Sequence, residues 1–100
     1  MKNQLPHTVT AAISALFSPD DRETVAEMLI EECNAERLYT TSEAAIERIQ
    51  LAVLKVSKGE IEKFLAAAEL AQLDWRDILM AAGFGNDVKA HLKWVERFKE

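Results

Sequence analysis

The sequence contains one cysteine and two histidines, the side chains most often used for nucleophilic, redox and metal chemistry. The acidic residues nearest to Cys33 are Glu31, Glu32 and Glu36. Neighbouring carboxylates raise the pKa of a thiol, whereas a nucleophilic cysteine needs a nearby base or a positive field. Cys33 also falls on the apolar side of a predicted helix, so we interpret it as a buried structural side chain.

The remaining candidates for chemistry lack the partners that each type of site requires. His7 and His91 belong to no closely spaced set of zinc ligands. Glu27 and Glu31 have the spacing of two carboxylates on one helix face, but the Glu-x-x-His motif of di-iron bundles is absent. The segment 83–85 lacks the following glycine, the lysine and the preceding strand of a phosphate-binding loop. We therefore expect no cofactor, no metal and no enzyme activity, with a site assembled from distant residues as an alternative.

The charge is unevenly distributed along the chain. The formal net charge is −5, and residues 1–50 hold four Lys and Arg against nine Asp and Glu, whereas residues 51–100 hold eight against eight. Glu23, Glu27 and Glu31 recur at steps of four and share one face of a predicted helix. This charge disfavours nucleic acid and anionic membranes and favours a basic protein partner.

Four of the seven aromatic residues lie between positions 75 and 98. Aromatic side chains at helical spacing usually belong to the core. The alternative is that Trp75, Phe84 or Trp94 anchors a partner, because large aromatics are enriched among the residues that contribute most to binding. We keep both interpretations of these three residues.

Helix-start and helix-stop signals divide the chain into about half a dozen segments, and no stretch reads as a strand. Ser18 and Pro19 indicate the start of a helix over 19–33, and the pair Thr40 and Glu43 indicates a central helix of about 40–56. The pair Ser57 and Glu60 indicates a helix over 57–73, and Asp74 and Gly83 mark the two ends of a helix over 74–82. A last helix is expected from Asn86 to about Phe98. In the last helix, Val88, Leu92 and Val95 form the expected inward stripe.

These signals predict an all-α fold, a compact bundle of about five to six short helices without a sheet, in a single domain over residues 1–100. Residues 8–17 fit a first helix, but Thr8, Val9 and Thr10 also favour extended structure. The alternative to a first helix is that residues 1–17 form a loosely packed N-terminal segment. One cysteine, no apolar run of transmembrane length and no signal-peptide pattern favour the cytoplasm.

Two local resemblances involve the C-terminal part of the chain. The run 77–85 followed by a helix resembles the second helix-turn-helix of arabinose-regulator-type transcription factors, which implies a reading helix with Lys89, His91, Lys93 and Arg97 facing DNA. Asp87 and Glu96 on that helix and the acidic chain oppose this interpretation. The stretch 74–84 is also similar to segments of small uncharacterised bacterial helical proteins, which implies bacterial origin and no activity.

The leading functional hypothesis is a non-catalytic helical module that binds another protein or regulates it. Glu23, Glu27 and Glu31 would steer a basic partner, and the three aromatics Trp75, Phe84 and Trp94 would supply anchors. Self-association is a second form of the same hypothesis, because short helices can leave an apolar face uncovered. A small DNA-binding regulator that uses residues 74–98 is the alternative.

Overall fold

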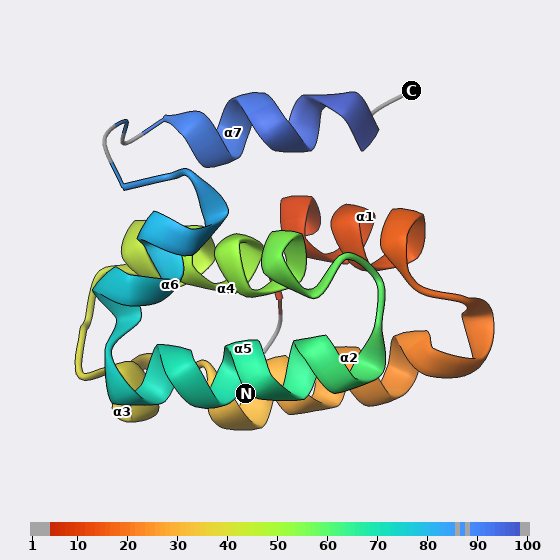
Figure 1. The fold of residues 1–100 in the computed structure, drawn as a ribbon, viewed down its shortest axis with the longest axis horizontal. Coiled ribbons are helices and arrows are strands. Elements are labelled where there is room, and N and C mark those ends of the chain that lie inside the picture. Colours follow the sequence, from red (N-terminus) through yellow and green to blue (C-terminus); the bar gives the residue numbers. More distant parts are fainter. Residues whose placement is uncertain (1–4, 86, 88, 99–100) are drawn as a thin grey trace.

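The computed structural model describes residues 5–85, 87 and 89–98, and within these ranges the chain consists of helices and their connections (Figure 1). In chain order the helices are α1 (His7–Leu16), α2 (Pro19–Glu32), α3 (Ala35–Leu38), α4 (Glu43–Ser57), α5 (Ile61–Leu73), α6 (Trp75–Ala82), α7 (Ala90–Val95) and the 3₁₀ turn η1 (Glu96–Phe98). The predicted all-α fold is confirmed. The described part has one α-helix more than the expected upper number, because the polar connection after Cys33 forms the single turn α3.

Helix α4 is the centre of the molecule. Its residues Leu51, Ala52, Val53 and Leu54 are all 0% exposed. Successive residues of a helix are about 100° apart, so four consecutive buried positions require neighbours around most of the helix. These neighbours are α1, α3, α5, α6 and α7. In Figure 1, α4 lies at mid-height, with α7 above it and α5 below it. The expectation of a central helix is confirmed.

The start and the stop of α6 also agree with the sequence signals. The carboxylate of Asp74 accepts a hydrogen bond of 3.1 Å from the backbone N–H of Arg76, so it caps the helix as expected. Gly83 ends the helix with a φ of 81°, a left-handed conformation that glycine adopts without a steric penalty. The local chemistry of these two residues is enough to define the helix.

Two predicted caps are wrong. The N-cap of α4 is Ser42, whose hydroxyl accepts from the amide of Ala45, while Thr40 accepts from the amide of Ser42 in the preceding connection. Ser57 is the last residue of α4, and its hydroxyl donates to the carbonyl oxygen of Leu54. Before α4, Thr40, Thr41 and Ser42 all carry a hydroxyl group, and the backbone path decides between them. Before α5, the position of the cap falls on Glu60, because α4 continues through Ser57.

The N-terminal segment is helical from residue 7 and contributes buried side chains from residue 9 onward. Val9, Ala12 and Ile13 of α1 are buried, and the ring of Phe17 packs edge-on against the ring of Phe64, with 5.9 Å between centroids. Helix α1 contacts α2 and α4. The interpretation of residues 1–17 as a loosely packed segment is therefore wrong for residues 7–17, and residues 1–4 lie outside the described ranges.

Helix α7 turns a different side inward from the expected one. His91 and Val95 are buried, at 5% and 1% exposure, whereas Leu92 is 40% exposed. Residues 91 and 95 are one turn apart and share a face, and residue 92 is rotated by about 100° from it. The expected stripe is therefore wrong at Leu92, while Asn86 and Val88 lie outside the described residues. Within the described ranges, no helix combines the length and the apolar composition that crossing a bilayer demands.

Candidate functional site

The carboxylates that the sequence places on one side of α2 are exposed. Glu23, Glu27 and Glu31 all point away from the core, since Val25 and Leu29 occupy the inward side of the same helix. Helix α5 packs beside α2 and carries two further exposed carboxylates, those of Glu62 and Glu69. We call these five carboxylates, at positions 23, 27, 31, 62 and 69, the acidic surface. It belongs to the layer that lies at the bottom of Figure 1.

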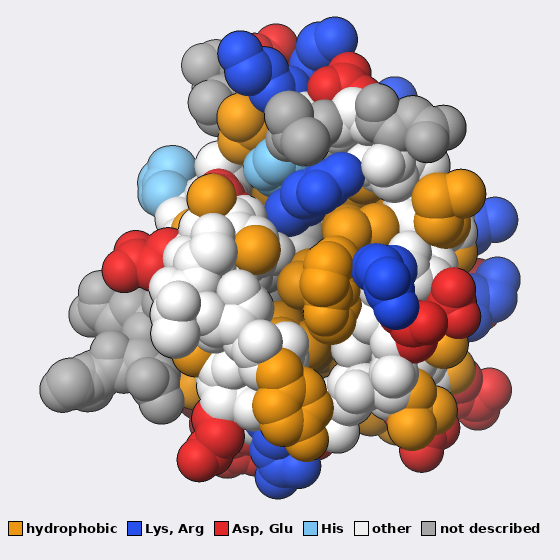
Figure 2. Space-filling model, turned by 90° about the vertical axis from the view of Figure 1, so that its left-hand side faces the viewer, with side chains coloured by type: hydrophobic (Ala, Val, Ile, Leu, Met, Phe, Trp, Pro, Cys, Tyr) orange, Lys and Arg blue, Asp and Glu red, His pale blue; other side chains and the backbone are white. Residues whose placement is uncertain are grey.

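One end of the molecule exposes large apolar side chains. They are Tyr39 at 88%, Leu73 at 79%, Met80 at 62% and Trp75 at 39% exposure. They come from the residue after α3, the end of α5 and helix α6, which lie together at the left of Figure 1. Figure 2 looks onto this side and shows hydrophobic side chains gathered in the middle, between basic and acidic ones. We call these four residues the apolar end.

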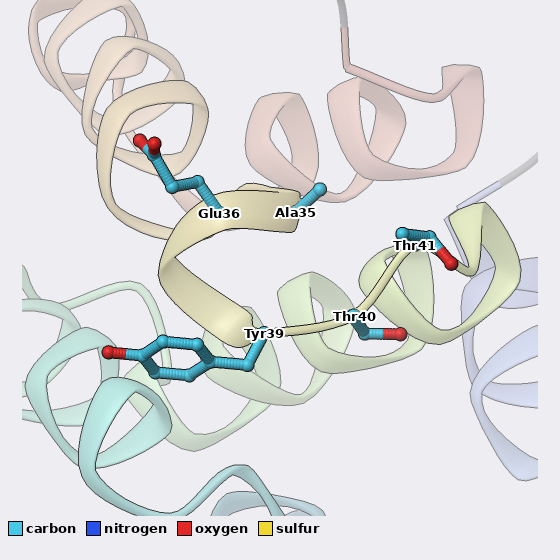
Figure 3. A pocket seen from close by; sticks show the side chains of 5 residues that line it. All are labelled: Ala35, Glu36, Tyr39, Thr40 and Thr41. Atoms are coloured by element: carbon cyan, nitrogen blue, oxygen red, sulfur yellow. The ribbon is translucent and has the colours of Figure 1, made fainter.

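Tyr39 is held in an unusual backbone conformation. It ends α3 with φ 56° and ψ 42°, the left-handed region that a residue with a bulky side chain rarely adopts. The amides of Tyr39 and Thr40 both donate to the carbonyl oxygen of Ala35, so this conformation closes the helix. Figure 3 shows the Tyr39 ring extending away from α3, at the edge of a shallow depression that Glu36 and Thr41 also line. The ring therefore contributes to the surface rather than to the core.

The three predicted aromatic anchors have different environments. Trp75 is partly exposed and belongs to the apolar end. Phe84 is 1% exposed, so its assignment as a surface anchor is wrong. The chain folds back after Gly83 and places the ring beneath Lys55, whose Nζ atom lies 5.0 Å from the ring centroid. Trp94 is partly buried and packs edge-on against Phe98, with 5.0 Å between centroids. Trp75 is therefore the predicted aromatic that remains as a candidate anchor.

Sequence reasoning missed Tyr39, Leu73 and Met80. Leu73 directly precedes the N-cap Asp74, so the chain leaves α5 at this residue and turns into α6. Tyr39 occupies the left-handed stop of α3, where glycine is usual. Glycine or a polar residue is usual where a helix ends in a turn. A large apolar residue at such a position is therefore the sequence signal that could have indicated an exposed apolar surface.

The two groups most relevant to chemistry are both buried. Burial raises the pKa of the Cys33 thiol to about 12, and the charge of Glu32 adds to this effect. Burial lowers the pKa of His91, and its Nδ1 atom has no hydrogen-bond partner among the described residues. In the ranges that the structure describes, no three side chains of the metal-binding types come together. Cys33 is thus a buried thiol with little thiolate at neutral pH.

The residues that would face DNA do not share one surface. Lys89, Lys93 and Arg97 are exposed, but His91 is buried on the opposite side of α7. A step of two residues rotates a helix position by about 200°, so residue 91 is directed away from residues 89 and 93. Helix α7 packs on α1 and α4, and the ammonium of Lys93 lies 3.5 Å from the carboxylate of Asp87. The predicted DNA-reading set is therefore wrong at His91.

The acidic surface and the apolar end are the two exposed features on which a function can be argued. They meet where α2, α3 and the end of α5 come together, since the side-chain amide of Gln72 on α5 donates to the carbonyl oxygen of Glu32 at the end of α2. Comparisons of the chain with protein-family models, with curated proteins and with solved structures found no match.

Proposed function

We propose that the protein works by binding a basic protein partner rather than by catalysis. The observation that carries this proposal is the apolar end, where Tyr39, Leu73 and Met80 are each more than half exposed. Exposed large apolar side chains that gather on one surface are typical of interaction sites. Aromatic residues such as Tyr39 and Trp75 are also favoured as anchors in binding interfaces.

The charge around the apolar end supports a basic partner. The acidic surface runs along α2 toward this end, with Glu31 one residue from the end of the helix. Glu36, which lines the depression beside Tyr39, adds another exposed carboxylate. Complementary charge accelerates the encounter of two proteins and orients them. A partner with lysine and arginine around an apolar centre would match this arrangement.

The backbone of Tyr39 gives a further argument for binding. A non-glycine residue in the left-handed region costs about 1 kcal/mol. The side chain offers no compensation in the isolated chain, because it is 88% exposed. Conformations with such a cost are concentrated at functional sites. A contact of the Tyr39 ring with a partner would offset the cost.

The test compares two triple variants with the same change in net charge. Glu23→Gln, Glu27→Gln and Glu31→Gln remove three charges of the acidic surface, whereas Glu43→Gln, Glu60→Gln and Glu96→Gln remove three exposed charges that belong neither to the acidic surface nor to the apolar end. The tagged wild-type protein first isolates its partner from the native lysate at low salt, and the partner is purified and identified. Association rates are then measured for all three proteins over a range of ionic strengths.

We expect the acidic-surface variant to associate with the partner about tenfold more slowly at low salt and with a weaker salt dependence. The control variant should keep the wild-type rate within about twofold. Equal rates for the two variants would overturn the role of the acidic surface. Binding of a second copy of the chain or of nuclease-sensitive nucleic acid, with no stoichiometric protein partner, would overturn the proposal itself.

A further inference from the structure

His91 is buried beneath α7 in a mixed polar and aromatic environment. It is 5% exposed, and its ring centroid lies 6.2 Å from that of Phe84, which is itself 1% exposed. Its neighbour on the same helix face, Val95, is the other buried residue of α7. These two residues are the buried part of a helix of only six residues, and Ala90 and Trp94 pack beside them, partly buried, against the core. The imidazole is therefore one of two buried side chains that attach α7.

Charged groups from α4 and from the preceding connection surround this imidazole. Arg48 and Lys55 both lie near Phe84, since the guanidinium of Arg48 donates to the carbonyl oxygen of Phe84 and the Lys55 ammonium stands over its ring. Glu47 accepts a hydrogen bond from the hydroxyl of Thr8. Asp87 is held by the amide of Lys89 at 2.8 Å. Arg48 thus opposes a charged imidazole, and the carboxylates of Glu47 and Asp87 favour one.

The other elements that contact α7 add no buried charge. From α1, Thr8 is uncharged, and His7, the titratable residue of that helix, is exposed. From η1, Glu96 and Arg97 are exposed. Water screens exposed charges, so they influence the buried ring less than burial itself does. The environment therefore disfavours the imidazolium, in agreement with the lowered pKa of His91, whose largest cause is burial.

We infer that α7 and η1 form a pH-sensitive strap, and that protonation of His91 releases residues 90–98 from α1 and α4. Release would uncover Phe84 and separate it from the ring of Trp94, which now lies 6.1 Å away between centroids. The apolar end and the acidic surface would stay in place, because neither contains a residue of α7. This inference is independent of the proposed binding function.

The direction of the pH dependence follows from proton linkage. A released His91 has the ordinary pKa of 6.5, and the docked one has a lower pKa. The released form therefore binds the proton more readily. Docking is fully favoured above pH 6.5 and weakens about tenfold per pH unit below it, until the pH reaches the pKa of the docked form. Carboxyl groups in model peptides have pKa values of about 4, so the range above pH 5 is chosen to titrate histidine rather than carboxyl groups.

The test is amide hydrogen exchange of the whole chain between pH 7.5 and pH 5, corrected for the intrinsic pH dependence of exchange. We expect the protection of amides in α7 to fall several-fold or more across this range, while the amides of α4 keep theirs. His91→Phe, which keeps a ring and cannot titrate, should abolish the fall, and His7→Gln, which removes the exposed histidine, should leave it unchanged.

Three outcomes would overturn the inference. They are unchanged protection of α7 in the wild type, a parallel loss of protection in α4, and the same fall in His91→Phe. If His91→Phe does not fold, the imidazole resonances of the wild type decide, since the titration of His91 must then coincide with the shifts of the Trp94 indole. Titration of His91 without any change at Trp94 would also contradict the strap.

Discussion

The side-chain amide of Gln50 on α4 donates a hydrogen bond of 2.8 Å to the carbonyl oxygen of Cys33, the residue that caps the C-terminal end of α2. Both residues are buried. The last carbonyl groups of a helix have no partner within the helix, and water cannot reach this one. Gln50 therefore satisfies a backbone group that the fold would otherwise leave unpaired, and it links the central helix to α2.

Replacing Gln50 by leucine should destabilise the protein. The substitution keeps the side-chain size but leaves the Cys33 carbonyl buried without a donor, which costs about 1–3 kcal/mol. Gln72→Leu is the control, because Gln72 donates to the neighbouring carbonyl of Glu32 from a partly buried position where water can replace it. Urea denaturation should show a clearly larger loss for Gln50→Leu, and equal losses would contradict the role assigned to Gln50.

Gly59 should tolerate no side chain. Its φ is 80°, and a Cβ atom there would overlap the carbonyl oxygen of Leu16 at the end of α1. Backbone strain and overpacking together predict a loss of about 2–4 kcal/mol for Gly59→Ala. Gly83→Ala is the matched control, because Gly83 has a φ of 81° and its nearest neighbour to a new Cβ is the Lys55 ammonium at 3.7 Å.

Gly83→Ala should therefore show only the backbone penalty, about 1 kcal/mol. Thermal or urea unfolding of both variants measures the difference, which isolates the contact between the residue 59 turn and α1. Equal destabilisation of the two variants would mean that α1 can move away at no cost.

Tyr39→Gly should separate binding from stability. The substitution relieves the left-handed backbone and removes a ring that is 88% exposed, so we expect stabilisation of up to about 1 kcal/mol. The affinity for the partner should fall about tenfold or more at the same time. Lys58→Gly relieves a similar backbone conformation, with a φ of 54°, outside the apolar end and should leave binding unchanged. A Tyr39→Gly variant with wild-type affinity would exclude the ring from the binding surface.

The thiol of Cys33 should react only when the protein opens. With a pKa of about 12, thiolate is scarce at pH 8, and the 0% exposed side chain excludes a thiol reagent. We expect modification by a disulfide reagent at least about a hundredfold slower in the native protein than in urea. A native rate that matches the unfolded one would contradict the buried position.

The raised pKa of Cys33 also predicts how the stability of the protein changes at alkaline pH. The unfolded thiol, with a pKa of 9.0, ionises before the folded one, so the contribution of Cys33 is intact below pH 9 and is lost as the pH rises toward 12. Between pH 8 and pH 10.5 the wild type should therefore lose about 1–2 kcal/mol more than Cys33→Ala. An identical pH profile for the two proteins would show that the thiol does not contribute.

Local signals predicted the helices well. Asp74 and Gly83 define α6 through their own hydrogen bonds and backbone preferences, which depend little on the rest of the chain. The central helix was likewise predicted at about 40–56 from the pair Thr40 and Glu43, and α4 occupies Glu43–Ser57, because capping signals locate a helix start to within a few residues. These parts of the fold are encoded within a few residues.

Local sequence signals could not predict which large side chains are exposed. Whether Phe84 or Trp75 faces water depends on how the chain reverses after Gly83 and on which helix lies beneath it. The rotation of α7, which buries His91 and exposes Leu92, depends on its packing against α1 and α4. Both are long-range relationships, and helical spacing alone cannot choose between the sides of a short helix.

The all-round burial of α4 also determines when the chain can fold during its synthesis. When Ser57 leaves the ribosome, α1 and α2 have already been made, but α5 and α6 have not. The newly made α4 then has one apolar side without its neighbours. This side is fully covered only after α5, α6 and α7 have emerged, so the nascent protein exposes it while residues 58–95 are being made, and that is when a chaperone helps most.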